Sequence, residues 1–483
     1  MNLCKLFISC LPVLASFGAS AGNFDYTKGI IFVNEDWYGH QNSTINILFP
    51  DATDGNYWQY RAFQEENPGH ELGCTNQYGA IWDGRLFLIA KQEKDPGASI
   101  TGGRITVADG KSLKMLFQST IIDPSGAQCD GRGFVGVDKH KGYISSSNGI
   151  WIFDLDSYTV TGQVSGSGNP NADGDSPVTD PTGSLYHGQT GTMVEAQGKI
   201  FAAHQQYGIL VIDPAQDKVE NTISMDIVKP GAGVGSIVKS KDGSLWASVA
   251  PNTQGMGMAL PYIVKIDPTT LKTKVIPIEE PMYAPLNSWY AWTPDAFVAS
   301  TVNNCLYWKG GSNRWFSGSK IYKFDISTET TSLFIDLDAD NEDWKLYGCS
   351  IGVHPITDEI YMSLYHEFGK PTYITRRYAN DGSVIRDYDM IMNYWFPSLP
   401  LFPEAHDWSA ITETNTPDTD LYMQDNRLYT IGFANSTIDI YTLSGIKTRS
   451  IVPQYQAESF NLDLTPGIYL ARTNTMTKKI VIR

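Results

Sequence analysis

Basic residues are scarce in this sequence, and so are long apolar runs and uninterrupted helical stretches. Its 36 Lys and Arg residues are outnumbered by 52 Asp and Glu residues, which gives a formal net charge of −16. A nucleic-acid binder needs positive charge to neutralise phosphates, so nucleic acid is excluded as a partner. The 44 Gly and 25 Pro interrupt the chain too often for long helices, although 42% hydrophobic residues suffice for a folded core.

The sequence also lacks the common catalytic motifs. It contains no H-E-x-x-H and no phosphate-binding G-x-x-x-x-G-K. Its histidines occur singly, so a metal site would have to assemble from distant parts of the chain. A glycosidase needs two facing carboxylates, for which Glu35, Asp36 and Glu195 are the candidates. We therefore predict a binding protein that is not an enzyme and uses no cofactor or metal; a lyase or hydrolase is the alternative.

The N-terminus reads as a secretory signal peptide over residues 1–21. Lys5 supplies the positive charge, residues 6–17 form a short apolar region, and Ala19-Ser20-Ala21 is a small-residue cleavage site. The apolar region is too short to cross a bilayer, and no later run is long enough, so we predict no transmembrane segment. A lipoprotein would carry its acylated cysteine at the end of this region, whereas Cys10 lies in its middle; lipidation at Cys10 is the alternative.

Five segments of the chain share one pattern, in which alternating apolar residues end at an Asp that opens a polar turn. These aspartates are Asp109, Asp154, Asp213, Asp267 and Asp325, with separations of 45, 59, 54 and 58 residues. Related segments before and after them, ending near Asp51 and Asp381, bring the count to seven. A period near 50 residues, each made of short strands, is typical of a β-propeller, so we predict an all-β fold with a seven-bladed β-propeller over residues 22–410. Each Asp is predicted to cap the turn between the third and fourth strands of a blade.

The composition changes after the propeller. Residues 411–420 read as a linker, and residues 421–483 contain short alternating strands that predict a small Ig-like β-sandwich. Its stretches 440–445, 462–469 and 478–483 resemble the C-terminal sorting domain of the type IX secretion system of Bacteroidetes. That resemblance implies export to the cell surface or the medium.

The propeller resembles the DUF5074 family, the group that contains the BtuG-type surface cobalamin-binding proteins of gut Bacteroidetes. The matching stretches are 32–40, 72–79, 102–104, 130–136 and 147–150, and the resemblance covers about residues 28 to 403. It implies capture of cobalamin (vitamin B12) or a related corrinoid at the outer membrane, for uptake through a TonB-dependent transporter as a candidate partner. This chain departs from such lipoproteins in lacking a clear lipidation motif and in carrying the sorting tail.

Four cysteines remain once the signal peptide is removed, and none lies in a CxxC motif. We predict a disulfide between Cys74 and Cys129, because each enters the innermost strand of consecutive blades at a comparable position. Cys305 and Cys349 form a second candidate pair. The acidic run 336–343 begins like a calcium-binding EF-hand loop but lacks its Gly and its final Glu, so a solvated loop is predicted, with calcium as the alternative.

Loops that converge on one face of a propeller can surround a ligand, and the sequence supplies them with aromatic, amide and basic side chains. The candidate ligand-binding residues are Trp37, Tyr38, His40, Tyr78, Lys91, Arg132, Asn148, His187, Gln205, Tyr207, Trp246, Trp289, Tyr365 and Trp395. Stacking and hydrogen bonding from these groups suit a flat, amide-fringed corrinoid and also an oligosaccharide. The alternative is that several of them pack between blades. We predict a monomeric, exported surface protein that binds a corrinoid, with a glycan or a protein as the competing ligand.

Overall fold

The chain folds into two compact units, Met1–Asp407 and Trp408–Arg483, in a computed structural model. The structure describes residues 25–170, 184–251, 259–285, 296–310, 317–339, 341–366, 372–391, 397–406, 408, 420–424, 426–454, 457–474 and 476–482. The predicted signal peptide and most of the predicted linker lie outside these residues. In the described part, no helix is long and apolar enough to cross a membrane.

The first unit is built from antiparallel sheets, which we number in chain order. Sheet 1 contains β29 (Pro397–Leu401), β1 (Ile30–Asn34), β2 (Thr44–Leu48) and β3 (Trp58–Gln59). Sheet 2 contains β4 (Cys74–Trp82), β5 (Arg85–Gln92), β6 (Ile105–Asp109) and β7 (Met115–Ser119). Sheet 3 contains β8 (Gly131–Gly136), β9 (Lys141–Ser146), β10 (Gly149–Asp154) and β11 (Thr159–Gln163). Sheet 4 contains β12 (Thr190–Ala196), β13 (Lys199–His204), β14 (Gly208–Asp213) and β15 (Lys218–Ile223). Sheet 5 contains β16 (Ala232–Lys239), β17 (Leu245–Pro251), β18 (Tyr262–Ile266) and β19 (Thr273–Pro277).

Two further sheets complete this unit in the described residues. Sheet 6 contains β20 (Phe297–Ala299), β21 (Cys305–Gly310), β23 (Lys320–Asp325) and β24 (Thr330–Asp336). Sheet 7 contains β25 (Lys345–Val353), β26 (Ile360–Tyr365), β27 (Tyr373–Tyr378) and β28 (Val384–Met390), with the short β22 (Ser317–Gly318) added beside β25. Helices are short: α1 (Ala62–Glu66), η1 (Tyr26–Lys28), η2 (Ser184–His187) and η3 (Pro403–Ala405).

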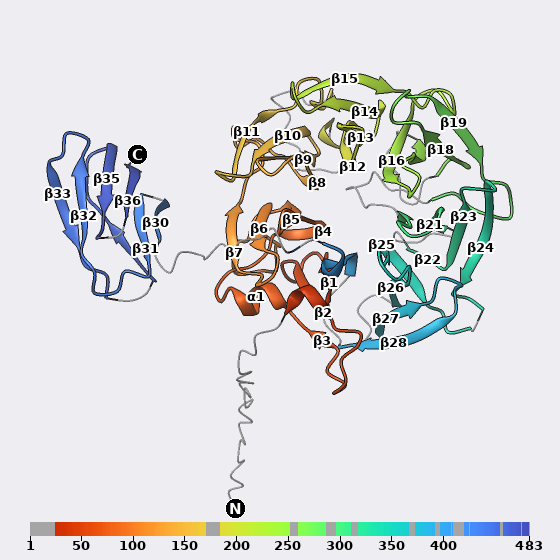
Figure 1. The fold of residues 1–483 in the computed structure, drawn as a ribbon, viewed down its shortest axis with the longest axis horizontal. Coiled ribbons are helices and arrows are strands. Elements are labelled where there is room, and N and C mark those ends of the chain that lie inside the picture. The colour runs from red at the N-terminus through yellow and green to blue at the C-terminus, as the bar shows by residue number, and fades with distance from the viewer. Residues whose placement is uncertain are drawn as a thin grey trace, which may run out of the picture. The chain divides into compact units, whose positions relative to one another are not determined.

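These sheets form a ring, as expected for a β-propeller. Figure 1 shows β4, β8, β12, β16 and β25 toward the centre and β7, β11, β15, β19, β24 and β28 at the rim. The C-terminal strand β29 pairs with β1, with Ile31 opposite Leu401, so the two ends of the unit share sheet 1. This pairing closes the ring and leaves no open edge at the junction.

The five repeated aspartates end or follow the third strand of their sheets, as predicted. Asp267 Oδ1 accepts hydrogen bonds from the backbone N–H groups of Thr269 and Thr270 at 2.8 and 3.0 Å. Asp325 makes the same pair of bonds with Ser327 and Thr328. Asp109, Asp154 and Asp213 also accept bonds from backbone N–H groups two or three residues onward. Their role is structural, because each carboxylate satisfies the donors of its own turn.

Apolar side chains fill the space between neighbouring sheets. Phe87 of sheet 2 stacks on Phe134 of sheet 3 with ring centroids 4.0 Å apart. Trp246 of sheet 5 packs against Phe324 of sheet 6 at 5.2 Å. Such large buried rings fit the wedge-shaped gap between twisted sheets, where neighbouring sheets share an apolar cluster.

The second unit is a small all-β domain with two sheets. One contains β30 (Asp420–Gln424), β31 (Arg427–Ile431) and β34 (Ala457–Asn461), and the other β33 (Lys447–Ile451), β32 (Ile438–Thr442), β35 (Gly467–Arg472) and β36 (Thr477–Ile482). Buried residues of both sheets, such as Leu428 and Ile440, share one apolar cluster. This unit therefore has its own core.

Candidate functional site

One face of the ring gathers the long connections. Neighbouring strands within each sheet are antiparallel, and the chain runs from the innermost strand outward. The connections between second and third strands therefore emerge on the same face as those that enter the next sheet. We call this the loop face; residues 35–43, 93–104 and 120–130 belong to it. The opposite turn face carries short connections such as Asp83-Gly84.

Exposed apolar side chains gather on the loop face. Twelve large apolar residues are exposed among the described residues of the ring. Eight of them lie in loop-face connections: Trp37, Tyr38, Ile100, Ile121, Tyr207, Ile227, Tyr283 and Ile391. Leu333, Val384 and Ile385 lie on outermost strands, and Ile356 alone of the twelve lies in a turn-face connection. Because exposed apolar groups that cluster on one side of a protein mark interaction sites, this face is the candidate binding surface.

The centre of the loop face is polar and buried. Glu35, which follows β1, accepts a hydrogen bond from Gln77 Nε2 of β4 at 2.6 Å, and its carboxylate also hydrogen bonds the Tyr347 side chain of β25. Burial raises the pKa of Glu35, whereas the nearby Lys91 ammonium lowers it. Three sheets thus contribute to one carboxylate-centred network.

Lys91 and Arg132 bring positive charge to the same region. Both are buried, with 8% and 0% of their surfaces exposed. Burial brings the pKa of Lys91 down to about 8; Glu35 opposes this shift and the Arg132 charge adds to it. Two buried cations that lie close to each other need hydrogen-bond acceptors around them. Arg132 has one in Oε1 of Gln189, which directly precedes β12 of sheet 4.

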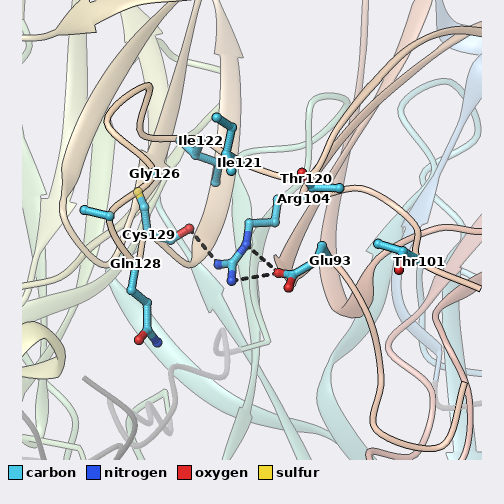
Figure 2. A pocket seen from close by; sticks show the side chains of 10 residues that line it. Glu93, Thr101, Arg104, Thr120, Ile121, Ile122, Gly126, Gln128 and Cys129 are labelled. Carbon is cyan, nitrogen blue, oxygen red and sulfur yellow. Dashed lines mark hydrogen bonds and ion pairs between the residues drawn. The ribbon is translucent and has the colours of Figure 1, made fainter. Parts of the chain in front are cut away.

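A pocket opens beside this centre, between the loop-face connections of sheets 2 and 3. Its volume is about 390 Å³, and its lining includes Glu93, Arg104, Thr120, Ile121 and Gln128. Figure 2 shows the Arg104 guanidinium between the Glu93 carboxylate and the Cys129 main-chain carbonyl. Nη1 of Arg104 also lies 3.1 Å from Asp130 Oδ1.

Asp130 joins the pocket to the buried centre. Its second oxygen, Oδ2, accepts a hydrogen bond from the Tyr186 hydroxyl at 2.6 Å and lies 3.8 Å from Arg132 Nη2. One carboxylate therefore holds Arg104 at the pocket and Arg132 at the centre. No group of three or more His, Cys, Asp or Glu side chains in the described part of the chain is placed to hold a metal ion.

Comparison with protein-family models agrees with the resemblance seen in the sequence. The model of DUF5074, described as a domain of unknown function, matches residues 28–403. The chain belongs to the DUF5074 family. Comparison with curated proteins gives no match.

Solved structures similar to the DUF5074 chain include several bacterial proteins. The extracellular domain of a protein described as the hybrid two component system BT4673, from B. thetaiotaomicron, is 13% identical, with a TM-score of 0.45; the match covers 94% of this chain and 57% of that one. PorZ, a surface component of the type IX secretion system of Porphyromonas gingivalis, is 13% identical, with a TM-score of 0.40 and coverage of 98% and 60%. The DUF5074 chain thus spans less than two thirds of the length of both. BamB from Moraxella catarrhalis is 12% identical, with a TM-score of 0.36 and coverage of 74% and 80%.

Four of the predicted ligand-binding residues are exposed on the loop face of the DUF5074 domain: Trp37, Tyr38, His40 and Tyr207. Trp37 and Tyr38 are 38% and 55% exposed, and the Trp37 ring packs on His40 with centroids 4.8 Å apart. Tyr207 is 41% exposed and stacks on the buried His204 at 4.5 Å. These aromatic surfaces are available to a ligand.

A second group of predicted residues is buried or half-buried around the centre. Lys91, Arg132 and Gln205 are buried, and Gln205 Oε1 accepts the backbone N–H of Gln189 at 3.3 Å. Asn148 and His187 are half-buried on the loop face. These residues shape and support the centre of the face and offer a ligand less surface than the exposed aromatics do.

Three predicted ligand-binding residues pack within the ring, which corrects their assignment. Trp246 is fully buried between sheets 5 and 6, and its Nε1 donates to Ser240 Oγ. The Tyr78 hydroxyl donates to the Phe134 carbonyl across sheets 2 and 3 at 2.9 Å. Tyr365 is 4% exposed and hydrogen bonds the Ser317 hydroxyl. Aromatic residues are also the usual filler between blades, and their spacing in the sequence cannot separate the two roles. Trp289 and Trp395 lie outside the described residues.

The predicted disulfide between Cys74 and Cys129 is not formed. Both are buried thiols outside any disulfide bond, as are Cys305 and Cys349. Cys74 Sγ hydrogen bonds Thr75 Oγ1 at 3.2 Å and Asp95 Oδ2 at 3.4 Å, whereas Cys129 lies in the apolar cluster between sheets 2 and 3. Comparable strand positions therefore do not bring the two sulfur atoms together.

The sequence-based candidates omitted several polar residues that the structure places at the site. They are Gln77, Glu93, Arg104, Asp130 and Tyr186. Arg104 and Asp130 stand beside glycines, in Gly102-Gly103-Arg104 and Asp130-Gly131, where a strand begins. A charged residue next to such glycines at a strand boundary is the signal that could have identified them.

The acidic run 336–343 carries a basic partner. Lys320 Nζ contacts Asp336 and lies 3.0 Å from Asp338 Oδ2. The lysine charge offsets these two carboxylates, as expected for the solvated loop predicted here.

Proposed function

We propose that this protein is an exported, surface-located, seven-bladed β-propeller that captures a corrinoid, cobalamin or a close relative, on its loop face for uptake. The signal peptide and an Ig-like sorting domain at residues 421–483 would direct the export. A TonB-dependent transporter is the proposed recipient of the ligand. We propose a monomer that binds its ligand without a catalytic step.

The observation that carries this proposal is the arrangement of the loop face. Eight exposed apolar side chains lie in connections around a polar centre that contains the half-buried Glu35 and the buried Lys91 and Arg132. A corrinoid has the matching character, since it combines a broad flat ring system with a fringe of amides. Aromatic stacking from Trp37, Tyr38 and Tyr207 suits the ring, and the polar groups suit the amides.

Isothermal titration calorimetry of the mature full-length chain with cyanocobalamin tests the proposal. Cobinamide, which lacks the nucleotide, and a panel of plant and host oligosaccharides are titrated in parallel. We expect saturable heat at one corrinoid per chain and none with the oligosaccharides. Absence of heat with every corrinoid would refute the corrinoid assignment, and saturable heat with an oligosaccharide would identify a glycan-binding propeller instead.

A further inference from the structure

The pocket between sheets 2 and 3 has one open donor and one open acceptor. Arg104 Nε and Nη2 both reach Glu93 Oε2, at 3.0 and 2.9 Å, and Nη1 reaches the carbonyls of Lys91 and Cys129 at 2.6 and 2.9 Å. A guanidinium has five N–H groups, so one hydrogen of Nη2 is left without an acceptor among the described residues. Glu93 Oε1 likewise has no donor among them, and the Glu93 side chain is 40% exposed.

The charges around this pair disfavour an ionic ligand. The guanidinium of Arg104 is already paired with the carboxylates of Glu93 and Asp130. A ligand carboxylate would therefore face two carboxylates, and a ligand ammonium would face the guanidinium. An uncharged group that presents an acceptor and a donor side by side satisfies both open positions, and a primary carboxamide is such a group.

The remaining lining suits a short aliphatic chain. Ile121 and Ile122 form an apolar wall, and Ile121 is 46% exposed. A volume of about 390 Å³ exceeds the needs of one carboxamide, so the pocket also has room for the methylenes that carry it. The pocket lies among loop-face connections, next to the buried centre that Asp130 joins to it.

We propose that this pocket is a subsite for the terminal primary carboxamide of an aliphatic arm of the ligand. The amide oxygen accepts from Arg104 Nη2, and the amide nitrogen donates to Glu93 Oε1. The assignment deepens the proposed function and rests on it in one respect, namely that the arm belongs to a corrinoid.

The chemistry of the pocket is tested without a corrinoid. Propionamide, sodium propionate and propane-1,2-diol are titrated against the full-length chain by saturation-transfer-difference NMR. We expect wild-type protein to prefer propionamide over propionate by about tenfold, equivalent to about 1.4 kcal/mol. In Glu93→Gln the repelling charge is gone and the new amide can donate to a carboxylate, so this preference falls to about twofold or less.

A matched control exists on the turn face. Asp83 pairs with Arg85 at 2.7 Å, and Asp83→Asn removes one carboxylate from an arginine pair far from the pocket lining. It leaves the amide preference unchanged. Equal binding of propionate or the diol to wild-type protein, no propionamide binding, or an unchanged preference in Glu93→Gln would overturn the subsite.

Cobalamin monocarboxylic acids, in each of which one amide arm is hydrolysed, link the pocket to the ligand. We expect one positional isomer to bind wild-type protein about tenfold more weakly than cyanocobalamin and to recover in Glu93→Gln. Equal binding of all isomers would overturn the subsite while the proposed function stands. Propionamide binding without any corrinoid binding would refute the proposed function and leave the pocket as an amide site for another ligand.

Discussion

Arg132 donates two hydrogen bonds to a single oxygen of Gln189, from Nε at 3.1 Å and from Nη2 at 2.6 Å. Both side chains are fully buried; Arg132 lies in β8 of sheet 3, and Gln189 directly precedes β12 of sheet 4. Gln189 Nε2 in turn donates to the Tyr186 carbonyl at 3.2 Å. The pair therefore joins two neighbouring sheets through polar contacts at the centre of the loop face.

Replacing Gln189 should destabilise the ring. In Gln189→Leu the buried guanidinium of Arg132 loses the acceptor of two hydrogen bonds, and we expect the free energy of unfolding to fall by about 2 to 3 kcal/mol. Urea denaturation of the full chain measures this change. Gln189→Glu retains an acceptor of opposite charge and should lose less stability; an equal loss in both variants would show that shape, and not the acceptor, is what matters at this position.

Replacing Trp37 and Tyr38 together by alanine should weaken corrinoid binding at least about tenfold while the fold is retained. Each stacking residue is worth about 0.5 to 1.5 kcal/mol beyond its area burial, so two can supply the required 1.4 kcal/mol. Calorimetric titration measures the affinity. The exposure of both rings argues against a wedge between blades, so the melting temperature without ligand should stay within about one degree of wild type.

A matched control for this double variant is Tyr422→Ala. Tyr422 is also an exposed aromatic residue but belongs to the second unit, where it stacks on Tyr429 at 5.2 Å. It should leave corrinoid affinity unchanged. A fall of several degrees in the unliganded melting temperature of the Trp37 and Tyr38 variant would instead indicate a structural role for the pair.

The four cysteines of the mature chain should form no disulfide and should be unreactive in the folded protein. Burial raises the pKa of Cys74 and of Cys129 to about 12, so few thiolates are present at neutral pH. We expect slow alkylation by iodoacetamide under native conditions and labelling of all four thiols in denaturant without reductant. Intact-mass spectrometry counts the labels; two or more thiols that label only after reduction would reveal a disulfide.

His204 should make stability depend on pH in the acidic range. Burial lowers its pKa to about 3 in the folded chain, against about 6.5 when unfolded. The unfolded chain then binds one more proton between these values, so this group lowers stability as pH falls from about 6.5 toward 3, by up to about 1.4 kcal/mol per pH unit. Above pH 6.5 it has no effect.

The variant His204→Asn isolates this contribution. Nδ1 of His204 accepts from the backbone N–H groups of Gln206 and Tyr207, both at 3.0 Å, and an Asn oxygen can accept in the same way without titrating. Denaturation curves at pH 7 and pH 4.5 should show a larger acid-induced loss in wild type than in the variant. Equal losses would mean that His204 keeps an ordinary pKa in the fold.

Deletion of residues 420–483 should leave the propeller folded and its corrinoid affinity unchanged. The two units have separate apolar cores, so each is expected to unfold on its own. Calorimetric scanning of the truncated chain should retain the main transition, while cell fractionation should show that surface delivery is lost. Loss of the cooperative transition would show that the units form a single structural unit.

The repeat pattern by itself determined the strands, the turns and the propeller architecture. Alternating apolar residues that end at Asp109, Asp154, Asp213, Asp267 and Asp325 encode local structure, since strand faces and Asx turns involve residues close in the chain. The exposed pair Trp37 and Tyr38 was also predictable, because two bulky aromatics beside Gly39 in a polar loop have no local packing role.

The tertiary structure alone decided which polar and aromatic groups meet. Trp246 and Trp37 are the same residue type in comparable repeats, yet one fills a gap between sheets and the other is exposed. Arg104, which directly precedes β6 of sheet 2, meets Cys129 and Gln128 at the pocket only because sheets 2 and 3 stand side by side in the ring. Likewise Cys74 begins β4 and Cys129 lies two residues before β8, but each thiol has its own environment. Contacts between neighbouring sheets depend on how the sheets twist and pack, and a local sequence pattern carries no information about that geometry.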